Sequence, residues 1–293
     1  TLKQLRYLSA VAEHGHFGNA ASACHVSQST LSSGILELED AVGTSLVERS
    51  HRQVILTPLG QDVVERARDI LTAVEDLVGV CEASSAPFTG KLRLGVIPTI
   101  APYLLPGLLK RLRRKYPDFQ LFIREDLSAH LVDSLQHGEL DVLLLALPYP
   151  AENVETLHLF DDRFLFACPH EHEMAGREQV RTADLPGQDL LLLEDGHCLR
   201  DHALEACKLK EKEISVPYQA TSLNTIVQMV ANGIGVTLLP EMALKANILS
   251  RPYVSHSQFR ERDIARSNGL IWRRKTPRRE AFTRLAEFIS AGV

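Results

Sequence analysis

Residues 17–38 read FGNAASACHVSQSTLSSGILEL, and this stretch decides the fold of the N-terminal part of the chain. Hydrophobic residues recur at helical spacing on both sides of residues 24–27, which predicts two helices joined by a short turn. The small side chains of Ala20 and Ala21 let the helices approach closely, and Ser27 or Gln28 begins the second helix. This spacing is typical of a helix-turn-helix, whose second helix enters the major groove of DNA.

The second predicted helix has a polar outward face. Hydroxyl groups and first-turn amides suit phosphate oxygens, and the side-chain amide of Gln28 can pair with adenine through two hydrogen bonds. Serine and threonine also serve simply as helix caps, so this face alone does not establish DNA binding. The residues predicted to contact DNA from this helix are Ser27, Gln28, Ser29, Thr30 and Ser33.

A helix over residues 2–13 precedes this motif, and a predicted hairpin follows it. Residues 46–57 form two short apolar runs around a polar tip with Arg49 and Arg52, which predicts a wing that touches the DNA backbone or minor groove. Residues 1–60 contain four basic and five acidic side chains, a net charge of −1, and the whole chain has −5. Charge alone therefore does not select DNA, and the prediction rests on the helix-turn-helix and wing together.

A long helix is predicted after the wing, with Thr57 as its N-cap and Pro58 as its first residue. Its hydrophobic residues alternate four and three apart, a seam that favours pairing with a second copy of the helix over packing on the chain's own second domain. Residues 82–87 break the helix and form a hinge. The seam consists of Val63, Ala67, Ile70, Val74, Leu77 and Cys81.

From residue 90 onward, strands and helices alternate, which predicts an α/β domain with a parallel sheet covered by helices on both faces. The predicted domains are 1–58 (winged helix-turn-helix), 59–88 (linker helix and hinge) and 89–293. The last resembles a two-lobed, periplasmic-binding-protein-like (type 2) regulatory domain that binds ligands between its lobes. Strands are expected at 91–97, 120–125, 141–146, 163–167, 190–193, 235–239 and 265–272, and helices at 104–116, 127–137, 223–232 and 278–290.

Residues 196–207 read GHCLRDHALEAC and follow a short apolar run that predicts a buried strand. Cys198 is therefore expected in the first turn of a helix, where the macrodipole lowers a thiol pKa, and neighbouring His197 and Arg200 can add to that effect. Cys207 lies nine residues further on, so a helix would separate the two Cα atoms by roughly 13 Å. Since a disulfide needs about 7 Å or less, the helix must unwind before the two can join. The alternative is two ordinary half-buried thiols.

The composition is that of a soluble globular protein, with 45% hydrophobic and 24% charged residues. No apolar run or signal peptide indicates membrane insertion or export, so a cytoplasmic location is expected. Five scattered cysteines argue against a secreted disulfide framework and for a transient disulfide, with Cys24 and Cys168 in the core. No cofactor or metal is expected, because the closest histidine clusters, 14–16 and 170–172, look like exposed loops.

With both halves considered, the chain resembles the LysR-type transcriptional regulators over nearly its whole length. The matching residues include 26–28, Val-Ser-Gln, and 57–60, Thr-Pro-Leu-Gly. Residues 95–99 (GVIPT), 102–106 (PYLLP) and 193–201 (LEDGHCLRD) resemble the hydrogen peroxide sensors of that family. The chain differs at Ser128, where threonine is expected, and at Ser29, where proline is usual.

This resemblance implies that Cys198 is the peroxidatic cysteine and Cys207 the resolving one. It places the peroxide pocket at Thr99, Ser128, His197, Asp201 and Arg273.

The resemblance also implies partners. They are double-stranded operator DNA, hydrogen peroxide, a second copy joined through the linker helix, a homotetramer, RNA polymerase, and a thioredoxin- or glutaredoxin-type reductant, with no membrane partner. The expected function is redox-controlled transcription by a stoichiometric cysteine pair rather than enzymatic turnover. Two alternatives remain: a LysR-type regulator that responds to a small organic metabolite between the lobes, and a thiol peroxidase.

Overall fold

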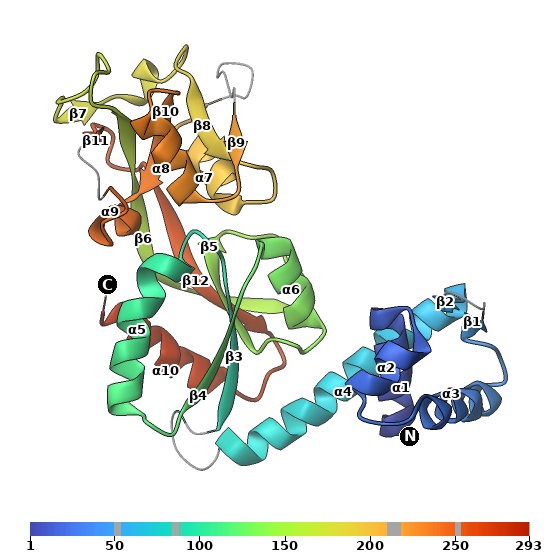
Figure 1. Cartoon of the computed structure of the whole chain (residues 1–293). Coiled ribbons are helices and arrows are strands. Elements are labelled where there is room, and N and C mark those ends of the chain that lie inside the picture. Colours follow the sequence, from blue (N-terminus) through green and yellow to red (C-terminus); the bar gives the residue numbers. More distant parts are fainter. Residues whose placement is uncertain (50–53, 84–87, 89, 210–217, 250–252, 293) are drawn as a thin grey trace. The chain divides into compact units, whose positions relative to one another are not determined.

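The computed structural model describes residues 1–49, 54–83, 88, 90–209, 218–249 and 253–292 (Figure 1). The chain divides into two compact units, residues 1–82 and 83–293, and each is described by itself. Within the described ranges, none of the helices combines the length and the hydropathy that crossing a membrane requires.

The first unit contains the predicted helix-turn-helix and wing. The helices are α1 (Leu2–His14), α2 (Phe17–Ala23) and α3 (Gln28–Val42), and the antiparallel hairpin is β1 (Val47–Arg49) and β2 (Val54–Leu56). Leu8, Leu31 and Ile35 are fully buried between the helices. A Cβ atom on Gly34 would lie 2.8 Å from the Tyr7 ring, so glycine permits the close contact of α3 with α1. The prediction for residues 17–38 is confirmed.

Helix α4 (Pro58–Ala83) begins where the sequence predicts. The Thr57 hydroxyl accepts a hydrogen bond from the Gly60 amide at 2.9 Å, which is the interaction of an N-cap. The expected hinge at 82–87 lies largely outside the described residues, because 84–87 are not described. The side chain of Cys81 is also outside the described part.

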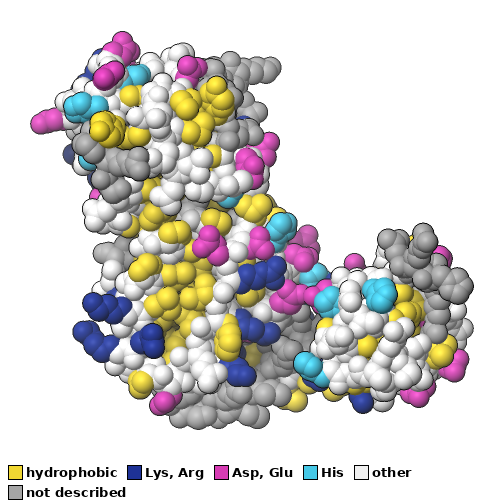
Figure 2. Space-filling model, in the orientation of Figure 1, with side chains coloured by type: hydrophobic (Ala, Val, Ile, Leu, Met, Phe, Trp, Pro, Cys, Tyr) yellow, Lys and Arg dark blue, Asp and Glu magenta, His cyan; other side chains and the backbone are white. Residues whose placement is uncertain are grey.

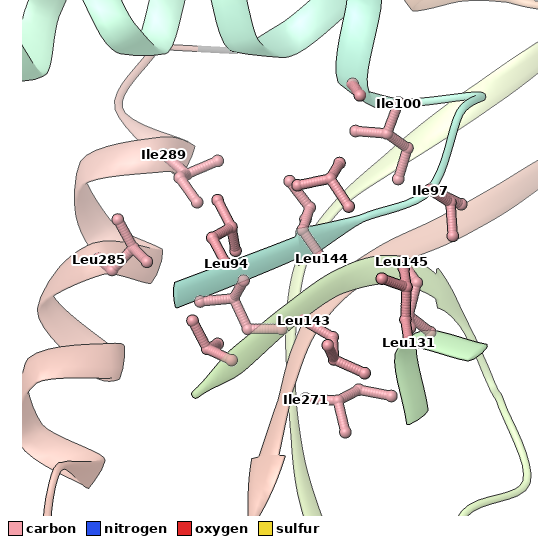
Figure 3. Close-up of a cluster of buried hydrophobic side chains, with 14 of the residues drawn as sticks. Leu94, Ile97, Ile100, Leu131, Leu143, Leu144, Leu145, Ile271, Leu285 and Ile289 are labelled. Atoms are coloured by element: carbon pink, nitrogen blue, oxygen red, sulfur yellow. The ribbon is translucent and has the colours of Figure 1, made fainter. Parts of the chain in front are cut away.

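The second unit has two lobes. Lobe 1 contains three parallel strands in the order β4-β3-β5, with α5 and α10 on one side and α6 on the other (Figure 1). Leucine and isoleucine side chains from the strands, from α10 and from the turn after β3 fill its core (Figure 3). The elements are β3 (Lys91–Val96), α5 (Ala101–Lys115), β4 (Gln120–Glu125), α6 (Ser128–Gln136), β5 (Val142–Leu147) and α10 (Arg279–Ser290).

Lobe 2 repeats this plan with the parallel order β10-β8-β9. Its separate core includes the four buried leucines of β8 and the apolar faces of α7 and α8. Its elements are β7 (Gln179–Val180), a 3-10 turn (Thr182–Asp184), β8 (Leu190–Leu193), α7 (Cys198–Ala206), β9 (Gln219–Ala220), α8 (Leu223–Ala231), β10 (Val236–Pro240), α9 (Glu241–Lys245) and β11 (Val254–Phe259).

Two long strands, β6 (Val154–Pro169) and β12 (Ala265–Arg273), connect the lobes. They pair with each other in antiparallel fashion; β12 also pairs with β5 of lobe 1, and β6 with β10 and β11 of lobe 2. Each lobe therefore has the predicted parallel strands, but the strands that join the lobes are antiparallel, and the strand predicted at 163–167 is part of a longer one. Strands that leave one lobe and return to it must run in opposite directions, and residues 154–162 are half exposed and do not form an apolar run.

Candidate functional site

The start of α7 is built by three local features. The buried strand β8 ends at Leu193, Gly196 turns the chain with a φ of 95°, and His197 is the N-cap residue. Glycine suits this turn because a side chain disfavours a positive φ. Cys198 is consequently the first residue of α7, as predicted, where backbone amides lack partners within the helix and the macrodipole favours an anion.

The two cysteines of α7 lie in different cores. Cys198 is 8% exposed and packs into the core of lobe 1, although its helix belongs to lobe 2. Cys207, the C-cap residue, is 3% exposed and packs into the core of lobe 2. Both thiols are free, and α7 is helical between them. Burial, together with a smaller effect of the Glu261 charge, raises the pKa of Cys207 to about 12, so this thiol is protonated at neutral pH.

The two basic residues beside Cys198 contribute less positive charge than expected. Burial lowers the pKa of His197, and the nearby carboxylate of Glu194 only partly opposes this. His197 is therefore neutral near pH 7. The buried Arg200 lies with its Nε 3.3 Å from Asp195 Oδ1, so its charge is paired with that carboxylate.

A buried arginine holds Thr99 in place through two hydrogen bonds. Arg266 on β12 donates to the Thr99 hydroxyl at 2.8 Å and to the Thr99 carbonyl at 2.9 Å. The guanidinium also pairs with Asp162 of β6 at 3.0 Å, and Asp162 accepts the Met242 amide at the start of α9. All these side chains are buried. The network joins lobe 1, the crossing strands and lobe 2 around Thr99.

Several buried polar atoms at the lobe junction have unused hydrogen-bonding capacity. The Ser128 hydroxyl on the first residue of α6, the Nδ1 atom of His202 on α7 and the side-chain amide of Asn268 on β12 have no hydrogen-bond partner among the described residues. Native proteins rarely leave such groups unsatisfied, so they mark places where water or a small polar ligand binds.

Thr99 and His197 also line a cleft between the lobes. Its volume is about 460 Å³, and it is bounded by the turns that follow β3 and β4 in lobe 1 and by the starts of α7 and α8 in lobe 2. Glu125, Asp126 and Glu194 contribute three carboxylates to its lining. The cleft therefore disfavours organic anions.

The remaining predicted pocket residues lie elsewhere. Asp201 is on an exposed side of α7. Arg273 donates from one guanidinium nitrogen to the carbonyls of Leu135 and Leu140 at 2.7 and 2.8 Å, where α6 ends. This is the opposite end of α6 from Ser128, about 10 Å along the helix axis. The structure thus places Thr99, Ser128 and His197 at the junction and gives Arg273 a bracing role.

Sequence reasoning missed Arg266, Asp162, His202 and Asn268. One signal was present: Arg266 and Asn268 fall two residues apart in a stretch predicted to be a strand, and both are therefore expected on one face. Buried charge without a visible partner is rare and often functional. Asp162, the partner of Arg266, is 104 residues away in the sequence, so the pair cannot be recognised locally.

The candidate DNA interface is the exposed N-terminal part of α3. Ser27 is the N-cap and accepts the Thr30 amide at 3.1 Å, and its hydroxyl also bonds to those of Ser29 and Thr30. The predicted DNA-contacting residues of α3 are all exposed. On the wing, the side chain of Arg49 and all of Arg52 lie outside the described residues.

Comparisons with known proteins agree with this architecture. Residues 2–61 match the family of bacterial regulatory helix-turn-helix proteins of the lysR type, and residues 85–293 match the LysR substrate binding domain. This chain belongs to the LysR family. Its two units are the two parts that define LysR-family regulators.

Three relatives of this LysR-family chain are informative. A probable hydrogen peroxide-inducible genes activator of Streptomyces viridosporus is 42% identical, over 98% of this chain and 92% of the relative. The DNA-binding transcriptional dual regulator OxyR of Escherichia coli K12 is 40% identical, over 99% and 95%. The structure of a Corynebacterium glutamicum OxyR mutant with bound H2O2 superimposes with a TM-score of 0.70 at 35% identity, over 100% of this chain and 92% of that chain.

Proposed function

We propose that this LysR-family chain is a DNA-binding transcriptional regulator that senses hydrogen peroxide through Cys198. The observation that best supports this function is the position of that sulfur at a helix start between two lobes, one turn from His202, whose buried Nδ1 atom has an unused hydrogen bond. Hydrogen peroxide is small and both donates and accepts hydrogen bonds, which suits such a place. The names of the relatives are consistent with this function.

The first step is oxidation of Cys198. Its sulfur attacks one peroxide oxygen, so an S–O bond forms while the O–O bond breaks. The sulfur becomes a sulfenic acid, and the departing oxygen takes a proton and leaves as water. The hydroxyl groups of Thr99 and Ser128 orient the peroxide, and Arg266 fixes Thr99 in place.

The second step forms the disulfide. The Cys207 thiol gives up its proton and attacks the sulfenic sulfur; an S–S bond forms, the S–O bond breaks and water leaves. Because roughly 13 Å of helix separates the two Cα atoms, α7 must unwind, and Cys207 must leave the core of lobe 2. This rearrangement alters the regulatory domain and thereby promoter binding. A dithiol reductant of the thioredoxin or glutaredoxin class restores the thiols.

Thiol counting with peptide mapping tests both steps. Reduced protein treated with stoichiometric peroxide should lose two thiols and yield a peptide linked between Cys198 and Cys207. The Cys168→Ser variant is the matched control, since Cys168 is also buried but lies on β6 outside α7. An unchanged thiol count in the wild type would remove peroxide sensing as the function.

DNA binding and self-association belong to the same proposal. On α4, Ile70 is 46% exposed and Leu77 is 66% exposed, as expected for a seam that packs against a second copy of the helix. Lobe 1 also has exposed hydrophobic side chains next to lysine and arginine side chains (Figure 2). The exposed hydrophobic residues of β4 are Phe122 and Ile123. A dimer through α4 and a tetramer through the regulatory domains would cover both surfaces. RNA polymerase is the expected partner at the promoter.

Sedimentation and footprinting test this part. Leu77→Glu should shift the sedimenting species to a smaller assembly, whereas the helix-face control Glu65→Gln, which is exposed off the seam, should not. Cys198→Ser should bind operator DNA with a footprint that peroxide does not alter. Loss of DNA binding in Cys198→Ser would instead assign that cysteine a structural role.

The inter-lobe cleft supports a second candidate function, regulation by an organic metabolite. Its volume of about 460 Å³ exceeds what hydrogen peroxide needs, and its three carboxylates suit a neutral or cationic compound. A metabolite that raises the melting temperature of Cys198→Ser would support this function. Peroxide-dependent thiol loss that no metabolite alters would support the first.

A further inference from the structure

His202 is a half-buried histidine whose Nδ1 atom is fully buried, and the chemistry above does not use it. It lies four residues after Cys198 on α7, so the two side chains project from the same helix face, with Cβ atoms about 5–6 Å apart. Both point towards the junction between the lobes, because α7 packs against β12 and Cys198 packs into the core of lobe 1.

The segment after β5 lies near both side chains. Tyr149 lies close enough to Cys198 for electrostatic interaction: burial raises the pKa of Tyr149, and Cys198 raises it further. His202 forms a hydrogen bond with the backbone of the preceding residue, Pro148. Proline has no N–H group, so the Pro148 carbonyl accepts this bond from the ring. Consecutive residues of one segment thus lie near Cys198 and bond to His202, one turn apart on α7.

The hydrogen bonding of the ring defines its tautomer. Nδ1 of His202 is buried and has no hydrogen-bond partner in the described part of the chain, the Cys198 sulfur included. Catalytic hydrogen bonds are often long before the substrate binds and shorten in the reacting complex. The donor to Pro148 is therefore Nε2, and in the neutral ring Nδ1 presents an unused lone pair.

The surroundings keep this ring neutral at pH 7. Burial lowers the pKa of His202, and the charge of Arg266 on β12 lowers it further. The hydrogen bond to Pro148 and the carboxylates of Glu205 and Asp201 on α7 oppose this shift. Strand β8, which also packs against α7, consists of four leucines and contributes no charge.

We infer that His202 Nδ1 is the proton acceptor for the Cys198 thiol, so that the imidazole activates the sulfur that attacks peroxide. This inference rests on the proposed reaction of Cys198. As the sulfur attacks, its proton moves to Nδ1, the S–O bond forms and the O–O bond breaks. The departing hydroxide then takes the proton from Nδ1, which leaves sulfenic acid, water and a neutral ring.

The same surroundings explain why the proton is passed on. A buried imidazolium beside Arg266 is unfavourable, so the ring acts as a relay and does not retain the proton. Below the pKa of His202, Nδ1 is already protonated and cannot accept the thiol proton. The rate at which Cys198 reacts should therefore fall in acid as His202 becomes charged.

The test measures the rate of Cys198 oxidation by peroxide, and separately its alkylation by iodoacetamide, between about pH 5 and about pH 8, by peptide-resolved mass spectrometry. In H202Q, the glutamine amide can still donate to Pro148 but offers no titrating acceptor. We expect H202Q to react about tenfold or more slowly at pH 7 in both assays and to lose the acid-side inflection of the wild type. Circular dichroism checks that H202Q is folded, and H202A serves as the second variant.

The outcomes separate the two proposals. Identical rates and pH profiles in wild type, H202Q and H202A would overturn the role of His202 while leaving peroxide sensing intact. Wild-type Cys198 that is alkylated with the predicted profile but never oxidised by peroxide would support the role of His202 and remove peroxide sensing. A slower H202Q that keeps the wild-type inflection would also overturn the inference, because an inflection that remains after the ring is removed does not come from His202.

Discussion

The two ends of α7 hold the same type of side chain in very different surroundings. At the N-terminal end, Cys198 lies at a junction of lobes beside a helix start, an imidazole and buried groups with unused hydrogen bonds. At the C-terminal end, Cys207 lies in an apolar core where burial raises its pKa to about 12. Sequence distance and residue type are poor guides to thiol chemistry, because reactivity depends on what surrounds each sulfur.

The largest expected effect is a difference in thiol loss between serine substitutions at the two cysteines. Cys198→Ser should lose no thiols with stoichiometric peroxide, whereas Cys207→Ser should lose one and accumulate sulfenic acid at Cys198, because the resolving sulfur is missing. Thiol titration and dimedone labelling measure this difference. Equal thiol loss in the two variants would mean that the ends of α7 do not have distinct roles.

The next effect concerns the reactivity of Cys207 itself. Its pKa of about 12 against the usual 9.0 lowers the thiolate fraction at neutral pH about 1,000-fold. Alkylation of Cys207 in the folded, reduced protein should be slower than in urea-unfolded protein by about that factor, while Cys198 should show a smaller ratio. Peptide-resolved alkylation rates provide the measurement, and a Cys207 ratio near one would contradict its burial.

The same shift predicts how stability depends on pH. Because folding raises the pKa of Cys207, its contribution is fully present below about pH 9 and is lost as pH rises towards about 12. The free energy of unfolding of the wild type should therefore fall more steeply above about pH 9 than that of Cys207→Ala, by roughly 4 kcal/mol at most. Urea denaturation at several pH values measures the two slopes. Equal slopes for the two proteins would show that burial does not raise the pKa of Cys207.

A loss of stability of similar size is expected when Arg266, which holds Thr99 in place, loses its partner Asp162. Asp162→Asn leaves Arg266 buried without its charge partner, which should cost about 3–5 kcal/mol of stability. Asp195→Asn is the control, because Asp195 pairs with Arg200 but is 85% exposed on its side chain, and surface pairs contribute about 1 kcal/mol or less. Denaturant unfolding of both variants decides whether the lobe junction depends on the buried pair.

The smallest effect concerns Asp201, which the family resemblance places in the peroxide pocket. Since this carboxylate is exposed in the first turn of α7, Asp201→Asn should change the rate of Cys198 oxidation less than about threefold and stability by about 1 kcal/mol or less. Stopped-flow oxidation measures the rate. A tenfold slower reaction would return Asp201 to the pocket and weaken the contrast between the faces of α7.

Local sequence signals predicted the elements that local interactions determine. The helix-turn-helix, the N-cap at Thr57 and the start of α7 at Cys198 depend on caps, glycine turns and helical periodicity within a few residues, and all three are confirmed. Strand β6 was too short in the prediction and β11 was missed. Their residues are partly exposed, and their pairing partners lie far away in the sequence.

The candidate site was predicted less completely, for a related reason. Cys198 and Thr99 stand in recognisable motifs, whereas the pairing of Arg266 with Asp162, 104 residues earlier, is visible only in the tertiary structure. The sequence prediction placed Arg273 in the pocket, whereas Arg266 is the arginine that contacts Thr99, and this error has the same cause. Both arginines lie on β12, and only the tertiary contacts show that one meets Thr99 while the other meets the end of α6.

Cys198 is packed into lobe 1 although its helix belongs to lobe 2, and this has a mechanical consequence. If the proposed oxidation occurs, the added oxygen atom enlarges a side chain that packs against lobe 1, and overpacked cores lose about 1–3 kcal/mol. Oxidation would then push the lobes apart at one point before any second sulfur arrives. The signal would begin as a steric wedge, and the disulfide would lock in a displacement that oxidation had already started.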